Sequence, residues 1–169
     1  MGNANRYRRG KRQLVRVPVA SATVIEKGDF VVLSSGKATT PAQLLADGSE
    51  KTTSTLARDA IADVFVGIAE DASASGSTTD ILVDVSIDSI YELKQATAEA
   101  ISFGDLIAVK ANSTASASYT CADDSIDAVA SGSTNPIAVC VKEHTAAEGT
   151  GTLCKLLPNK IMNPTTGQD

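Results

Sequence analysis

The chain has 169 residues and a mass of 17.4 kDa, enough for one domain with its own core, so its stability requires neither a metal nor a disulfide. Hydrophobic residues make up 43% of the sequence but aromatic residues only 4%, without tryptophan, which excludes a large aromatic platform for stacking nucleic-acid bases. The net charge of -5 is distributed unevenly along the chain.

The first part of the chain is strongly basic. Six of the 15 Lys and Arg residues precede the first acidic residue, Glu26, which leaves nine cations against 20 acids, or -11, on the rest. We interpret residues 1–13 as a flexible basic arm, and its candidate contact residues are Arg6, Tyr7, Arg8, Arg9, Lys11 and Arg12. Three interpretations are open, namely a solvated terminus, a nucleic-acid arm, and a tether that becomes ordered on an acidic protein surface. The acidic remainder opposes the nucleic-acid arm. We favour the tether, in which arginine forks pair with carboxylates and Tyr7 is an apolar anchor.

The next segments alternate with a period of two, which predicts half-buried strands. Residues 14–19 place Val15, Val17 and Val19 on one face, and residues 81–87 place Asp84 on the face expected to meet water. Further strands are predicted at 30–33 and 66–69. Between them, Thr40 followed by Pro41 predicts the start of a short helix that ends near residue 48.

The same order of elements then returns. Residues 90–95 and 104–109 repeat 14–19 and 28–33 at an offset of 76 positions, and 137–140 repeat 66–69 at an offset of 71. We therefore predict a duplicated β domain over 14–157, with units at 14–87 and 90–157, followed by a tail at 158–169. The predicted fold is all-β and mainly antiparallel, a β-barrel or β-sandwich with one or two short helices in its loops. The second helix is predicted at 126–130, capped by Asp123.

Each unit contains one Gly-Asp pair at the matched position, Gly28-Asp29 and Gly104-Asp105. Two carboxylates at matched positions could act as an acid-base pair. The alternative is structural, because glycine adopts the positive φ of a tight turn and aspartate hydrogen-bonds its own turn backbone. We favour structural turns at both positions.

Other candidate chemistry is weak. Cys121, Cys140, Cys154 and the single histidine, His144, lack the paired short spacings of zinc motifs, so we interpret the cysteines as reduced small hydrophobic residues. The sequence 149–151 is glycine-rich but lacks the Lys-Ser/Thr of a phosphate-binding loop. We therefore expect no catalytic site, no cofactor and no metal, and the chain is predicted not to be an enzyme.

Three segments resemble one known family. Residues 89–94 (SIYELK), 101–107 (ISFGDLI) and 137–141 (IAVCV) resemble the pattern of phage capsid cement, or decoration, proteins. That pattern is a hydrophobic-Tyr/Phe-Glu-Leu-Pro-Lys strand, a Gly-Asp turn leading into a strand, and an Ile-Gly-Val-Ala strand. The chain departs from it in three places, because no proline lies between Leu93 and Lys94, Ala108-Val109 replaces an aromatic pair, and Ala138 replaces glycine. The resemblance covers roughly residues 14–157.

The resemblance implies a structural virion protein, made in the host cytoplasm, that binds the outer surface of the phage head. Its implied partners are the major capsid protein and further copies of itself, as a homotrimer. No apolar run of the sequence approaches the length that spans a bilayer, so we expect no membrane partner, and the acidic remainder argues against nucleic acid. Two alternatives remain open at this point. One is a tail-tube or head-tail connector protein, and the other is a nucleic-acid-binding module that uses the basic arm.

Overall fold

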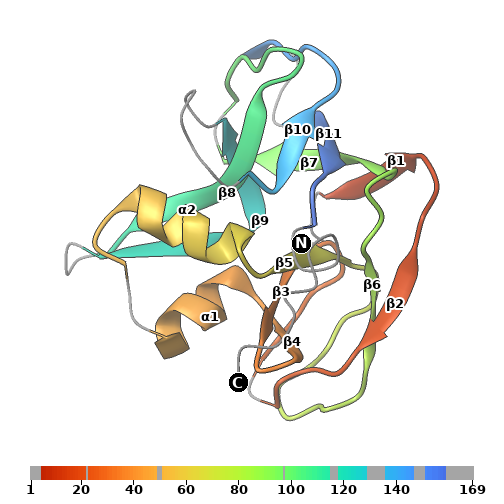
Figure 1. The fold of residues 1–169 in the computed structure, drawn as a ribbon, viewed down its shortest axis with the longest axis vertical. Helices are drawn as coiled ribbons and strands as arrows, with labels where there is room; N and C mark the ends of the chain where they lie inside the picture. Colours follow the sequence, from red (N-terminus) through yellow and green to blue (C-terminus); the bar gives the residue numbers. More distant parts are fainter. Residues whose placement is uncertain are drawn as a thin grey trace.

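The computed structural model describes residues 5–21, 23–48, 51–96, 98–114, 118–128, 136–146 and 151–158. The predicted fold class is confirmed, since the chain forms two mainly antiparallel sheets with two short helices between strands (Figure 1). In the described part of the chain, neither helix is long and apolar enough to cross a membrane.

The two sheets divide the chain almost in sequence order. The first sheet has the order β2-β6-β5-β3-β4, built from β2 (Leu14–Val17), β3 (Phe30–Ser34), β4 (Lys37–Thr39), β5 (Phe65–Ala69) and β6 (Ile81–Asp84). The second has the order β1-β7-β11-β10-β8-β9, built from β1 (Arg6–Arg9), β7 (Ile90–Gln95), β8 (Leu106–Ser113), β9 (Tyr119–Ala128), β10 (Ala138–Cys140) and β11 (Gly151–Leu156). Only β1 lies in the sheet of the other half of the chain.

Each sheet curls back on itself. In the second sheet β7 runs parallel to β9, with Lys94 opposite Ser125, and this pairing closes a five-stranded barrel. In the first sheet a parallel bridge joins Val19, just after β2, to Ala38 in β4, so this sheet closes as well. We call the two closed sheets the first barrel and the second barrel. The two closing pairs occupy matched places, because Ala20 and Ala96 are 76 positions apart and each donates a backbone hydrogen bond to the closing strand. Ala20 N donates to Ala38 O at 3.1 Å, and Ala96 N donates to Ile126 O at 3.4 Å.

The matched turns and bridges carry the same backbone hydrogen bonds. Gly28 N donates to Ala69 O at 2.7 Å, and Gly104 N donates to Cys140 O at 2.9 Å. Two further antiparallel bridges also correspond, Ile25 with Ser73 and Ile101 with His144. The two sheets therefore share one hydrogen-bonding plan at the offsets of 76 and 71 positions.

Helix α1 (Pro41–Gly48) begins and ends where the sequence predicts. Thr40 Oγ1 accepts the N–H of Gln43 at 3.4 Å, and a second cap comes from far along the chain, because Asp123 Oδ1 accepts the N–H of Ala42 at 2.8 Å. Asp123 therefore caps α1 from β9.

The helix predicted at 126–130 is wrong. Residues up to Ala128 belong to β9, and residues 129–130 lie outside the described residues. Ile126 pairs with Val109 of β8 and with Gln95 of β7, and these two ladders outweigh the local capping signal.

Helix α2 (Ser54–Ala62) is a second helix that lies at a different place from the one predicted. Its N-cap is Thr53, whose side chain accepts the N–H of Leu56 at 3.2 Å. Its buried face, which includes Ala57 and Ile61, joins the larger apolar core, and α2 packs against β8 and β9. The helices therefore bridge the two sheets.

The core consists of two apolar clusters. The smaller lies inside the first sheet and contains Val17, Val19, Ile25, Val31, Ala38, Val66, Ala69, Ile81, Val83 and Val85. The larger joins Phe30, Phe65 and Ile68 of the first sheet to the helices and to the second sheet. Strand β5 contributes to both clusters, which explains why all five of its residues are buried.

Candidate functional site

The basic segment differs from the flexible arm predicted over residues 1–13. Arg6–Arg9 form β1, which pairs antiparallel with the first half of β7, with Tyr7 opposite Tyr91 and a bulge at Arg8. Strand β9 pairs with β7 only at Lys94 and Gln95, so β1 occupies the edge that β9 does not reach. Pairing satisfies backbone groups that a free arm would leave in water. Residues 1–4 of the predicted arm lie outside the described residues.

Tyr7 fixes β1 to the barrel. Its ring packs edge-on against Tyr91, with 5.9 Å between centroids and an interplanar angle of 77°. Its hydroxyl donates a hydrogen bond of 2.6 Å to the carbonyl oxygen of Gly10. Tyr91 is only 1% exposed as a result of this packing and of its place in the core. Tyr7 is therefore an intramolecular anchor.

Gly10 makes the turn between β1 and β2 possible. Its φ is +112°, a left-handed value that side chains strongly disfavour, and an added Cβ would lie 2.0 Å from the carbonyl oxygen of Asp88. The backbone therefore approaches residues 88–89 as closely as glycine allows.

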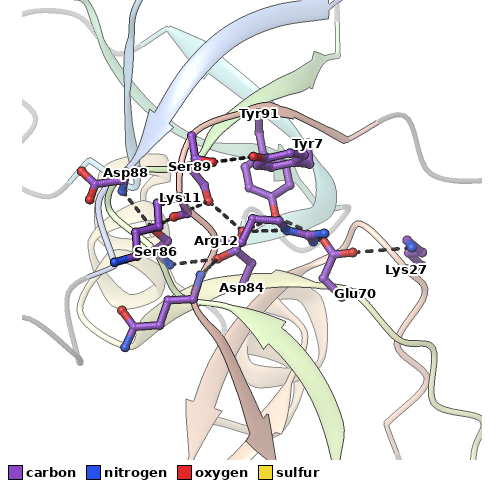
Figure 2. Close-up of polar contacts among 12 residues, drawn as sticks. Tyr7, Lys11, Arg12, Lys27, Glu70, Asp84, Ser86, Asp88, Ser89 and Tyr91 are labelled. Atoms are coloured by element: carbon purple, nitrogen blue, oxygen red, sulfur yellow. Dashed lines mark hydrogen bonds and ion pairs between the residues drawn. The ribbon is translucent and has the colours of Figure 1, made fainter.

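A buried carboxylate, Asp84, lies beyond this turn (Figure 2). Its side chain is completely buried and accepts five hydrogen bonds. Two come from the hydroxyls of Tyr91 and Ser89, both at 2.8 Å, two from the backbone N–H groups of Gln13 and Ser86, both at 3.1 Å, and one from Arg12 Nε at 3.3 Å. The prediction that Asp84 meets water is wrong. It lies at the end of β6, where the chain turns toward the second barrel, so its neighbours come from both sheets.

Arg12 supplies the countercharge. Its guanidinium pairs with Glu70, lies 3.3 Å from Asp84 through Nε, and sits 4.7 Å over the ring of Tyr7 (Figure 2). Lys27 adds a second cation 3.5 Å from Glu70. This cluster links β1, the first sheet and β7.

The surroundings keep the hydroxyl of Tyr91 and the guanidinium of Arg12 protonated, so both groups can donate hydrogen bonds. Burial, followed by the hydrogen bond to Asp84, raises the pKa of Tyr91 well above its usual value. Burial alone would lower the pKa of Arg12, but its hydrogen bonds to Glu70 and Tyr91 outweigh this effect and raise it. Tyr91 therefore stays protonated and Arg12 charged, so Arg12 is a structural cation and not a free contact residue.

The remaining cations of the segment face outward. Arg8 pairs with Glu92, whereas Arg6, Arg9 and Lys11 are exposed, and the described residues provide no ion pair for them. Two hollows flank β1. One of about 400 Å³ includes Arg6 and Lys27 in its lining, and one of about 610 Å³ includes Arg9 and Lys142. We call Arg6, Arg9 and Lys11 the basic patch.

The Gly-Asp pairs form matching turns. Gly28 and Gly104 have φ values of +95° and +88°. Asp29 Oδ2 accepts the N–H of Glu26 at 2.7 Å, and Asp105 Oδ2 accepts the N–H of Ser102 at 2.8 Å. Both carboxylates are thus used in backbone capping of their own turns.

The cysteines and the histidine do not gather into a metal centre. Within the described residues, no group of three or more His, Cys, Asp or Glu side chains is placed to hold an ion. All three cysteines are free and buried, and Cys140 lies opposite Cys154 in the β10–β11 ladder. Burial raises the pKa of Cys121 to about 12 and also raises the pKa of Cys140 and Cys154. The thiols are therefore protonated near neutral pH.

We expect this burial to be visible as slow thiol labelling. At pH 8 the native protein should react slowly with a disulfide reagent, and the unfolded chain should titrate three thiols at once. The unfolded thiols ionise near a pKa of about 8.5. The contribution of the buried thiols to the free energy of unfolding should therefore be fully present below that pH, and it should fall as the pH rises toward 12, the pKa of Cys121 in the folded protein. The Cys121→Ala variant should flatten this alkaline slope. Rapid labelling of the native protein would contradict the assigned burial.

Glu70, Asp84 and Ser89 are the residues that sequence reasoning missed. One feature of the sequence does point to Asp84, because it interrupts the apolar run at 81–85. The residues on either side of it, Val83 and Val85, are buried. No local pattern indicates that Arg12 lies beside it, because the two are 72 positions apart.

Comparisons with known proteins identify no relative. No protein-family model and no curated protein matches the sequence, and no solved structure matches the fold.

Proposed function

We propose that the protein is a structural component of a phage particle, a cement protein that binds the outer surface of the head and stabilises contacts between major capsid protein subunits. Two independent features support the proposal. The first is the resemblance of residues 89–94, 101–107 and 137–141 to that family. The second, which carries the proposal, is the basic patch, which lies on β1 and just after it. The part of the chain after Arg16 has nine cations against 20 acids.

The basic patch suits adhesion to an acidic shell surface. A strand that is already ordered loses less conformational entropy on binding than a flexible arm would. Arginine forks pair well with carboxylates, and each pair is strengthened when water is excluded. The acidic remainder keeps free trimers apart from one another before they meet the shell. The function therefore combines mutual repulsion in solution with attraction to the particle.

Reinforcement follows from mass action. A protein that binds only the assembled lattice shifts the equilibrium away from disrupted shells. As a homotrimer, the protein would present three basic patches at once, and the high effective concentration of the second and third patches would convert weak contacts into stable attachment.

Cosedimentation with empty mature capsids tests the proposal. We expect the full chain to pellet with shells and the Arg6→Ser/Arg9→Ser variant to bind at least about tenfold more weakly, since each lost charge-assisted contact costs about 1.5–3 kcal/mol. The matched control is Lys37→Ser/Lys51→Ser, which has the same net charge but leaves the basic patch intact. It should pellet like the natural chain.

Failure of the natural chain to pellet with shells would contradict the proposed function. The mass of the free protein in solution is a second measurement, for which we expect three chains. A hexameric ring would instead favour a tail-tube or connector protein.

A further inference from the structure

The two barrels differ at one matched edge. In the second barrel β1 covers the first half of β7, with pairs at Ile90, Tyr91 and Glu92. The positions that correspond to these at the offset of 76 are Leu14, Val15 and Arg16 of β2. Strand β2 pairs only with β6 in the described part of the chain.

The backbone groups of this edge point outward. Val85 N donates to Gln13 O at 2.9 Å, and this register makes the odd-numbered residues of β2 the ones that bond to β6. Leu14 and Arg16 therefore direct their N–H and C=O groups to the opposite side. Further along, Ala38 N donates to Pro18 O at 2.7 Å on that side, so β4 covers only the edge beyond Arg16.

The side chains of this edge are also partly exposed among the described residues. Val15 is 39% exposed and Leu14 46% exposed, although Val15 corresponds to Tyr91, which is 1% exposed. Tyr91 is covered by Tyr7 of β1. An aromatic residue opposite Val15 would do the same in the first barrel.

The charge at this edge is reversed. Glu92 of β7 pairs with Arg8 of β1, whereas the position that corresponds to Glu92 is the exposed Arg16. The second barrel therefore binds a basic strand, and the first barrel presents the complement of an acidic one.

We propose that β2 is a docking edge for an extended acidic segment of a partner protein, which adds to the first barrel as β1 adds to the second. The segment runs antiparallel to β2, places an aromatic residue opposite Val15 and a carboxylate beside Arg16, and bonds to the outward backbone groups of Leu14 and Arg16. The identity of the partner rests on the proposed function, under which the segment belongs to the shell protein.

The probe is a capped peptide, Asn-Glu-Tyr-Glu-Glu-Gly, which is residues 5–10 with every arginine changed to glutamate. We expect it to bind the full-length protein and to slow amide exchange at Leu14 and Arg16 by about tenfold or more. The control peptide has the natural sequence of residues 5–10 and should leave both amides unchanged.

Two pairs of variants separate strand addition from simple charge attraction. Leu14→Pro removes an outward N–H without breaking the β2–β6 ladder and should abolish peptide binding, whereas Leu14→Ala keeps the N–H and should bind within about threefold of the natural chain. Arg16→Glu should weaken the acidic peptide by about tenfold and admit the basic control peptide.

The outcomes distinguish this proposal from the proposed function. If the acidic peptide fails to bind at millimolar concentration, or binds Leu14→Pro as well as the natural chain, the docking edge is wrong, even where the protein still pellets with capsids. If the peptide binds as expected but the natural chain does not pellet with capsids, the docking edge stands and the capsid function is wrong.

Discussion

Replacing Asp84 by alanine is expected to lower the free energy of unfolding by about 3–5 kcal/mol, because it removes one partner of a buried ion pair and leaves the surrounding hydrogen-bond donors without an acceptor. The side chain is fully buried and is the common acceptor for Tyr91, Ser89 and two backbone N–H groups. Asp84→Asn keeps the size and one acceptor oxygen, so its cost should be smaller, about 1–3 kcal/mol. Urea unfolding measures both as shifts of the midpoint at constant slope.

The matched control for this experiment is Asp80→Ala. Asp80 is an exposed carboxylate just before β6, and its loss should change stability by no more than about 0.5 kcal/mol. Equal effects of Asp80→Ala and Asp84→Ala would show that the buried cluster contributes nothing beyond net charge.

The Gly10→Ala variant should lose about 3 kcal/mol of stability, the upper end for a single strained residue. The new methyl group would meet the carbonyl oxygen of Asp88 at 2.0 Å, so the turn must open and β1 must move away from β7. Amide exchange of β1 should therefore become fast while the ladder between β2 and β6 stays protected.

Gly36→Ala is the control for backbone strain alone. Gly36 also has a positive φ, +76°, but no atom lies within 4 Å of an added Cβ. Its cost should be about 1 kcal/mol, without release of β1. If Gly10→Ala were as mild as Gly36→Ala, the close approach to Asp88 would not be a constraint.

Local chemistry explains which parts of the fold were predictable. The turns at Gly28 and Gly104 depend on the glycine and the following aspartate, and α1 begins where Thr40 precedes proline, so short stretches of sequence are sufficient. The local pattern predicts a helix at 126–130, where residues 126–128 end β9, because the partners of β9 in β8 and β7 are distant in sequence. Long-range pairing overrides a local cap there.

The candidate site was predicted only in part, for the same reason. The density of cations from Arg6 to Arg12 is evident in the sequence, but their division into exposed and buried members depends on β7 and Asp84. Arg12 is spaced like its neighbours and nonetheless has a different role. Period-two patterns locate faces of strands and do not indicate where a chain crosses from one sheet to the other.

The position of β1 has a consequence for synthesis on the ribosome. Strand β1 leaves the ribosome before the other described strands, yet its partners, Ile90 to Glu92, are made only after the whole first sheet. Strand β1 must wait for this later segment, while β2 to β6 are free to assemble. Docking of β1 therefore reports that β7 has been made, so a nascent chain stopped before β7 should expose the cationic segment Arg6–Arg9 to proteases.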